Sequence, residues 1–268
     1  MNIRLDKYLV EKGFFPSREK ACDAISQGVV KVDAIITEKP SKIVNESSKI
    51  EITDVFNRYV SRGGLKLEKA LLEFRIDFTG KTVLDIGSST GGFTDCALQH
   101  GARLCFAVDV GTNQLHPALR DRKEVIFVEN KDFRFLTPEE TGNIAFDFIV
   151  ADVSFISLTY LFPYLRPFTH PDTRLVLLIK PQFEAGRSFL NRNGIVSDEK
   201  GYRIAIRKVT KEALAFGFHL NGLILSTLFE KNKNVEFLAL FSFKDTGYLL
   251  NFPHLENEIK NVKKRLKK

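Results

Sequence analysis

From Thr82 onward, short apolar runs alternate with segments of helical periodicity, and this alternation constrains the fold more than any other feature. Apolar runs of this kind are typical of strands buried on both faces, in a parallel sheet covered by helices. We predict strands at residues 83–86, 104–108, 125–128, 146–150, 175–179, 223–227 and 235–243. Few residues separate the last two, which favours a hairpin. The pattern therefore predicts an α/β fold with a mostly parallel, seven-stranded sheet.

The first 56 residues have a different pattern. Leu5, Tyr8 and Leu9 are spaced as on one face of a helix, and Ser17 is placed to cap a second helix that stops at Gly28. Short strands are expected next, at residues 29–32, 35–36, 42–44 and 49–52. We predict a small α+β domain at 1–56, a linker at 57–65, the α/β domain at 66–250 and a basic tail at 251–268.

The excess of positive charge is concentrated at the C-terminus. The chain carries 40 Lys and Arg against 33 Asp and Glu, a net charge of +7. Five of these positive charges lie in the last eight residues, so the rest of the chain sums to only +2. A basic excess usually indicates a nucleic-acid partner, but here only the tail is strongly basic.

A glycine-rich segment follows the first predicted strand of the α/β domain and opens a helix. An open parallel sheet binds nucleotide-like ligands at this place. The spacing lacks the second glycine of the dinucleotide motif, which favours a smaller adenosine ligand such as S-adenosylmethionine, and no Gly-Lys-Ser/Thr follows that would indicate a Walker loop. The candidate ligand contacts in this segment are Asp85, Gly87, Ser88, Ser89, Thr90, Gly91, Gly92 and Phe93.

Carboxylates follow the next two strands. Asp109 ends the second strand, where a carboxylate can accept hydrogen bonds from both hydroxyls of a ribose. Asp132 follows the third strand, where it could receive an adenine amino group. A glycine-rich turn alone can be an ordinary tight connection, but carboxylates at two successive strand ends favour a nucleoside site.

Four further charged residues could carry chemistry as a set. Asp152 ends the fourth strand and Lys180 the fifth, so both point to the crevice at the carboxyl edge of the sheet. A lysine directly after five apolar residues is costly to bury unless it emerges toward a partner. Glu236 begins an apolar strand and Lys66 begins a helix after two glycines, and either one alone could be an ordinary exposed charge.

The chain resembles the TlyA family over nearly its whole length. The resemblance rests on the glycine-rich loop and on four segments: Val60-Ser-Arg-Gly-Gly-Leu-Lys66, Ala151-Asp152-Val-Ser-Phe-Ile-Ser, Ile179-Lys180-Pro-Gln-Phe-Glu and Val235-Glu236-Phe. That family joins an RNA-binding domain of the ribosomal-protein-S-four type to an FtsJ-like ribose methyltransferase with a Rossmann-like class I fold. Members of this family were formerly named haemolysins.

The resemblance implies S-adenosylmethionine as methyl donor and the 2′-hydroxyl of a ribosomal RNA cytidine as acceptor. It also implies a catalytic set of Lys66, Asp152, Lys180 and Glu236, and no metal site. The sequence departs from the family at His116, where an aromatic residue is usual, and at Asp132, where Asn is common. We interpret His116 as a polar loop residue.

Methyl transfer to a hydroxyl requires that the oxygen be aligned and its proton removed. We assign Lys180 to contact the acceptor oxygen, with proton removal and orientation both open. Asp152 and Glu236 would steer it, and Lys66 would tune the site or hold substrate. Since two lysines and two carboxylates sum to zero charge, the set can be enclosed without stranding a charge.

The small domain would bring the RNA. We expect it to recognise RNA shape through a few contacts. Candidate RNA contacts are Arg4, Arg18, Lys20, Arg58 and Arg62. The expected partner is ribosomal RNA or a ribosomal subunit, and the oligomeric state is left open.

The N-terminus lacks the apolar core of a signal peptide, and no apolar run approaches the ~20 residues that span a bilayer. We therefore expect a cytoplasmic protein without a membrane partner, and its three cysteines, which form no CxxC, fit a reducing compartment. The alternatives are a membrane-active haemolysin, a non-catalytic RNA-binding protein and a pseudouridine synthase. The last would leave the nucleotide loop without a purpose.

Overall fold

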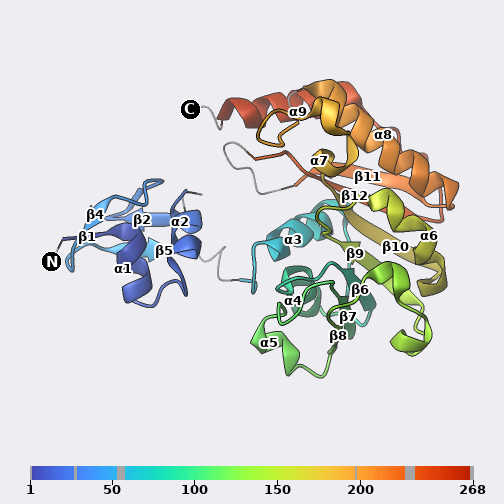
Figure 1. Cartoon of the computed structure of the whole chain (residues 1–268), viewed down its shortest axis with the longest axis horizontal. Helices are drawn as coiled ribbons and strands as arrows, with labels where there is room; N and C mark the ends of the chain where they lie inside the picture. The colour runs from blue at the N-terminus through green and yellow to red at the C-terminus, as the bar shows by residue number, and fades with distance from the viewer. Residues whose placement is uncertain (1, 27–28, 53–57, 197, 227–232, 266–268) are drawn as a thin grey trace. The chain divides into compact units, whose positions relative to one another are not determined.

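The chain folds into two compact units, residues Met1–Arg58 and Tyr59–Lys268, in the computed structural model (Figure 1). The structure describes residues 2–26, 29–52, 58–196, 198–226 and 233–265. Each unit has its own core of buried apolar side chains.

The small unit packs two helices on short strands. Helices α1 (Leu5–Glu11) and α2 (Arg18–Ser26) bury Leu5, Leu9 and Ile25, as the helical spacing predicts. Ser17 accepts a hydrogen bond from the backbone N–H of Lys20 at 3.3 Å, which is the predicted cap. The strands are β1 (Ile3–Arg4) paired with β4 (Ile43–Val44), and a sheet in the order β3 (Ile35–Ile36), β2 (Val30–Val32), β5 (Ile50–Ile52).

The large unit contains the predicted seven-stranded sheet. Its strands are β6 (Thr82–Ile86), β7 (Leu104–Val108), β8 (Val125–Val128), β9 (Phe146–Ala151), β10 (Thr169–Ile179), β11 (His219–Leu225) and β12 (Phe237–Ser242). Their order is β11-β12-β10-β9-β6-β7-β8, and β12 is antiparallel to both of its neighbours, whereas the other pairs are parallel. The mostly parallel sheet and the β11–β12 pairing are confirmed.

Strand bounds differ from the prediction mainly at two strands. β10 begins at Thr169, because a register shift before Arg174 lets its first residues join the sheet ahead of the apolar run. β11 begins at His219, four residues earlier than predicted, and the predicted end at Thr227 lies outside the described residues.

Alternating side chains of the sheet pack against helices on its two faces. On one face, Val83 and Leu238 join side chains of α3 (Gly63–Phe74) and α4 (Gly92–Gln99) in one core cluster. Their chain neighbours Leu84 and Ala239 join α8 (Glu199–Ala215) in another. Successive side chains of a strand thus point to opposite faces of the sheet, and helices cover both faces. The strands therefore appear in the sequence as continuous apolar runs. The shorter helices are α5 (Pro117–Arg120), α6 (Phe162–Leu165), α7 (Pro181–Glu184) and the 3₁₀ turns η2 (Phe133–Phe135), η3 (Glu139–Thr141), η4 (Leu158–Tyr160), η5 (Arg166–Phe168) and η6 (Arg187–Phe189).

The segment predicted as a basic tail instead forms helix α9 (Phe252–Arg265). Leu255 and Ile259 are buried in the core, and the Lys263 ammonium lies 4.8 Å from the centre of the Tyr202 ring. The tail prediction is wrong for these residues because apolar side chains spaced three and four apart lie between the lysines. Residues 266–268 are outside the described part.

The cysteines have the environment expected of small apolar residues. Cys96 and Cys105 are buried and Cys22 is half-buried, and none of the three is in a disulfide bond.

Candidate active site

The topology brings the four charged residues to one edge of the sheet. Asp152 directly follows β9 and Lys180 directly follows β10, and these two strands are parallel neighbours. β12 runs the opposite way, with Phe237 paired to Ile179, so Glu236 stands at the same edge as Lys180. The first turns of α3 carry Lys66 to this edge. The residues that sequence reasoning could only group by type are therefore neighbours in space.

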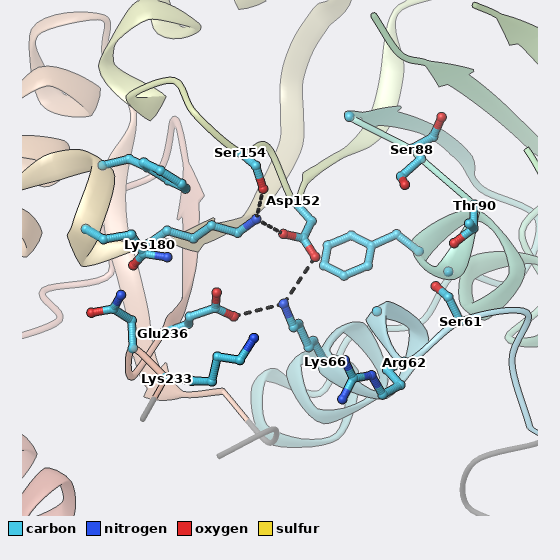
Figure 2. Close-up of a pocket in the computed structure, with 18 of the residues that line it drawn as sticks. Ser61, Arg62, Lys66, Ser88, Thr90, Asp152, Ser154, Lys180, Lys233 and Glu236 are labelled. Carbon is cyan, nitrogen blue, oxygen red and sulfur yellow. Dashed lines mark hydrogen bonds and ion pairs between the residues drawn. The ribbon is translucent and has the colours of Figure 1, made fainter. Parts of the chain in front are cut away.

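The four side chains form a chain of ion pairs (Figure 2). Lys180 Nζ lies 2.7 Å from Asp152 Oδ1, and Lys66 Nζ lies 3.3 Å from Asp152 Oδ2 and 2.8 Å from Glu236 Oε2. All four side chains are at least 80% removed from solvent. Two ammonium groups thus alternate with two carboxylates in a largely enclosed site, and each buried charge has an opposite neighbour.

The two lysines are held differently. Burial lowers the pKa of Lys66, but the carboxylates of Asp152 and Glu236 more than offset it, so its pKa lies above the ordinary value. Lys66 is therefore a fixed cation. Lys180 instead has one carboxylate partner, Asp152, and its ammonium donates a hydrogen bond to the hydroxyl of Ser154 at 2.6 Å.

Ser154 was missed by sequence reasoning. It lies two residues after Asp152 within a segment that the family resemblance quoted, but a lone serine has no spacing signal that would show its direction. The adjacency of β9 and β10, which sets this serine against Lys180, appears only in the fold.

A cavity of about 540 Å³ surrounds the ion-pair chain. It is lined by all four charged residues, by Ser154 and Arg62, and by most of the glycine-rich loop: Asp85, Gly87, Ser88, Ser89, Thr90, Gly92 and Phe93. Gly91 does not line it. An adjoining hollow of about 930 Å³ shares Gly87, Ser89, Asp152 and Ser154 with the first and extends to Asp109 and Asp132. The two hollows form one elongated cleft along the carboxyl edge of the sheet.

The last two glycines of the loop are required by packing of the chain itself. Gly91 has φ +91°, and a Cβ there would lie 2.3 Å from Leu119. A Cβ on Gly92 would lie 2.3 Å from Ser61 Oγ, at the start of the segment leading into α3. These glycines let α4 begin directly beneath the loop, and of the residues from Gly87 to Gly92 only Gly91 does not line the cavity.

Asp85 supplies an unpartnered acceptor to the cavity. Its side chain is fully buried, one oxygen accepts a hydrogen bond from Thr94 Oγ1 at 2.6 Å, and the other has no hydrogen-bond partner among the described residues. Burial raises the pKa of Asp85 to about 7. A buried acceptor without a donor indicates a position where a ligand donor or ammonium binds.

The two other carboxylates of the predicted nucleoside site differ. Asp109 accepts hydrogen bonds from the backbone N–H groups of Ser89 at 2.8 Å and Gly111 at 2.7 Å, which fix it at the rim of the second hollow. Asp132 is bound by the guanidinium of Arg134, at distances of 2.6 to 3.1 Å, and caps the turn that follows. The oxygens of Asp132 are therefore engaged within the chain.

His116 directly precedes α5 and caps it, because its Nδ1 accepts a hydrogen bond from the backbone N–H of Ala118 at 3.2 Å. It does not line the cavity around the ion-pair chain. The interpretation as a loop residue is confirmed.

The candidate RNA contacts fall into separate places. Arg4 and Arg18 both bind the buried carboxylate of Asp6, at 3.0 Å and 2.7 Å, and this pairing holds the pKa of Asp6 well below its usual range. Lys20 is exposed in the same unit. Arg62 lies at the wall of the active-site cavity near Lys66 (Figure 2). Arg58 is exposed at the end of the small unit.

None of the helices in the described ranges combines the length and apolarity needed to cross a membrane. The described residues also include no group of three or more His, Cys, Asp or Glu placed to hold a metal ion.

Comparison with known proteins found matches over both units. Residues 59–243 match the family of FtsJ-like methyltransferases, and residues 3–50 match the S4 domain. The chain is 43% identical over 244 residues to YqxC of Bacillus subtilis, covering 91% of this chain and 87% of that protein. It is 38% identical over 257 residues to the 16S/23S rRNA (cytidine-2′-O)-methyltransferase TlyA of Mycobacterium tuberculosis, covering 96% and 95% of the two chains.

A solved structure is also similar over nearly the full length. It is that of a Streptococcus thermophilus protein that carries a hemolysin name, with a TM-score of 0.78 and 35% identity, covering 99% of this chain and 98% of that one.

Proposed function

This chain belongs to the TlyA family of FtsJ-like methyltransferases, and on that premise we propose that it methylates the ribose 2′-hydroxyl of a cytidine in ribosomal RNA, with S-adenosylmethionine as donor. The observation that carries the proposal is the enclosed chain of ion pairs from Lys180 through Asp152 and Lys66 to Glu236, beside the glycine-rich loop. The names of the relatives support cytidine in ribosomal RNA as the methyl acceptor. The geometry of the four charged residues supports methyl transfer to a hydroxyl.

The residues at the cleft fit S-adenosylmethionine. Its α-ammonium needs a buried acceptor, and Asp85 has an oxygen without a partner. Its ribose needs a fixed carboxylate, and two backbone N–H groups hold Asp109 at the rim. Asp132 is a weaker candidate for the adenine, because Arg134 occupies its oxygens. When bound, S-adenosylmethionine supplies an electrophilic methyl group.

Lys180 is the residue that we assign to the acceptor hydroxyl. Both lysines line the cavity, but Lys66 is paired with two carboxylates, whereas Lys180 has one carboxylate and a serine hydroxyl as partners. Asp152 and Ser154 fix the direction of the Lys180 ammonium, and Lys66 and Glu236 complete a set with no net charge. The site thus orients the hydroxyl and gives its proton a nitrogen or carboxylate to move to.

The small unit supplies the RNA contacts in this proposal. Every ribonucleotide has a 2′-hydroxyl, so the choice of target must come from outside the cavity. Asp6 holds the guanidinium groups of Arg4 and Arg18 together on one surface, which suits a phosphate contact. Arg62, in the large unit, lines the cavity and could add a contact there. Lys20 and Arg58 remain candidates by exposure. The proposed substrate is ribosomal RNA, either free or assembled in a ribosomal subunit. The proposed location of the enzyme is therefore the cytoplasm, with the ribosomes.

The test is single-turnover methyl transfer from labelled S-adenosylmethionine to ribosomal RNA. Lys180→Ala should abolish transfer and leave the affinity for S-adenosylmethionine nearly unchanged. Lys81→Ala is the matched control, because Lys81 is an exposed lysine that pairs with Asp147 and does not line the cleft. Transfer by Lys180→Ala at the wild-type rate would overturn the assignment.

Lys180→Arg separates proton removal from orientation. Arginine keeps the charge but does not act as a base near neutrality. Substantial transfer by this variant would leave orientation as the role of Lys180. Loss of transfer, with a wild-type rate that rises with pH, would indicate proton removal by the coupled set.

A further inference from the structure

Glu184 is a buried carboxylate close to the active site that touches none of the four catalytic candidates. It is the last residue of α7, four residues after Lys180, and only 1% of its side chain is exposed. Burial raises its pKa. A carboxylate is costly to bury, and its contacts show what it connects.

Both oxygens of Glu184 accept hydrogen bonds from the loop that carries Asp152. One oxygen accepts a hydrogen bond from the backbone N–H of Leu158 at 2.8 Å, and the other accepts one from the Ser157 hydroxyl at 2.5 Å. Lys208 of α8 lies 3.5 Å from the same carboxylate and donates to Ser157 Oγ at 3.2 Å. Glu184 therefore links α7, the helix that follows Lys180, to the end of the loop that follows β9.

The segment 152–158 after β9 and the segment 180–185 after β10 are tied by polar contacts at two places. At one, Lys180 binds Asp152 and Ser154 at 2.7 and 2.6 Å. At the other, Glu184 binds Ser157 and Leu158. The first place must be free to meet a substrate, so the second is the polar contact that can hold the two segments at a fixed separation, together with the Phe155 and Phe183 rings, whose centres lie 5.4 Å apart.

We infer that Glu184 is a positioning residue for methyl transfer, which holds the loop after β9 at the distance where Asp152 and Ser154 align Lys180. This inference rests on the proposed function. Displacement of a reacting group by ~1 Å can cost about 100-fold in rate, so loss of the tie should lower the chemical step without changing binding.

The test compares Glu184→Ala, Glu184→Gln and Ser157→Ala in single-turnover transfer to ribosomal RNA. Glu184→Ala removes the tie and should slow transfer at least about tenfold, with KM for RNA and Kd for S-adenosylmethionine within about twofold of wild type. Glu184→Gln keeps a side-chain oxygen for Leu158 and an amide for Ser157, and should restore most of the rate. Glu124→Ala, which removes a half-exposed carboxylate paired with Arg122 and away from both hollows, is the control and should have no effect.

Rates are taken well below the melting temperature of each variant, so a purely structural role would lower the melting temperature and leave the rate per folded molecule unchanged. Wild-type transfer by folded Glu184→Ala would overturn the inference, as would a defect confined to KM or Kd. If Glu184→Ala does not fold, Ser157→Ala decides, with a slower chemical step expected and a wild-type rate contradicting the inference. If the wild-type protein methylates no RNA, the proposed function fails, and a crystal structure of Glu184→Ala tests the tie alone: an unchanged Lys180–Asp152 distance would contradict it.

Discussion

Asp85→Asn should make the protein more stable at alkaline pH and unable to bind S-adenosylmethionine well. Asp85 is fully buried, and burial raises its pKa from 3.8 to about 7. Between these two values the folded protein holds a proton that the unfolded chain releases. The free energy of unfolding therefore falls as pH rises from about 4 to about 7, and the ionised carboxylate is a cost above pH 7.

The size of this cost follows from the shift. A difference of about three pKa units corresponds to ~4 kcal/mol, which is an upper value for the gain when the charge is removed. Asparagine keeps the acceptor for Thr94 but puts an amide where the unpartnered oxygen stood, and an unsatisfied buried donor costs about 1–3 kcal/mol. We expect a net gain of about 1–3 kcal/mol at pH 8 and no gain, or a small loss, at pH 5.

Urea unfolding of wild type and Asp85→Asn at pH 5, 6, 7 and 8 measures the difference directly. Other titrating groups are common to both proteins and cancel in the comparison. Asp77→Asn is the control, because Asp77 is exposed and its pKa is lowered by Thr79, so it should show no gain on going to alkaline pH. If the difference in the free energy of unfolding between Asp85→Asn and wild type does not change with pH, Asp85 does not carry a buried charge in the folded protein. Unchanged affinity for S-adenosylmethionine in calorimetry would refute Asp85 as the ammonium site.

Three other outcomes follow from the same geometry. Asp109→Ala should weaken binding of S-adenosylmethionine by about 1.5–3 kcal/mol in calorimetry, since the ribose loses charge-assisted bonds, and unchanged affinity would mean that the ribose binds elsewhere. A chain that begins at Tyr59 should still bind S-adenosylmethionine, because every residue lining the cleft lies in the large unit, but should lose methylation of RNA; full activity would refute the two-part assignment. Lys264→Ala should reduce the salt dependence of RNA binding by up to ~0.7 in slope, whereas an unchanged slope would make α9 a structural helix only.

The sheet could be predicted because its strands are continuous apolar runs, most of them buried on both faces. β7 and β8 have the predicted bounds, since their apolar runs are as long as the strands themselves. β10 could not be delimited, because its first residues include His170 and Asp172, which do not read as a buried strand. α9 was hidden for the related reason that its charged residues outnumber the apolar residues that pack against the core.

The charged residues of the candidate site could be predicted from their positions at strand ends. The further residues that contact them could not. Asp152 and Lys180 follow apolar runs, and the parallel sheet necessarily brings such positions together. Ser154 and Glu184 are in quoted segments, but their partners lie 26 or 27 residues away, and only the pairing of β9 with β10 shows this. Asp132 illustrates the reverse, since the Arg134 that engages its oxygens is two residues away and was overlooked.

The central claim is that the Lys180 site methylates one ribose of ribosomal RNA. Mass spectrometry of nuclease fragments of ribosomal RNA tests it most directly, in cells that lack this chain and are supplied with either the wild-type or the Lys180→Ala protein. We predict a ribose methyl on a cytidine with the wild-type protein and its absence with Lys180→Ala. The same methylation pattern with both proteins would contradict the claim.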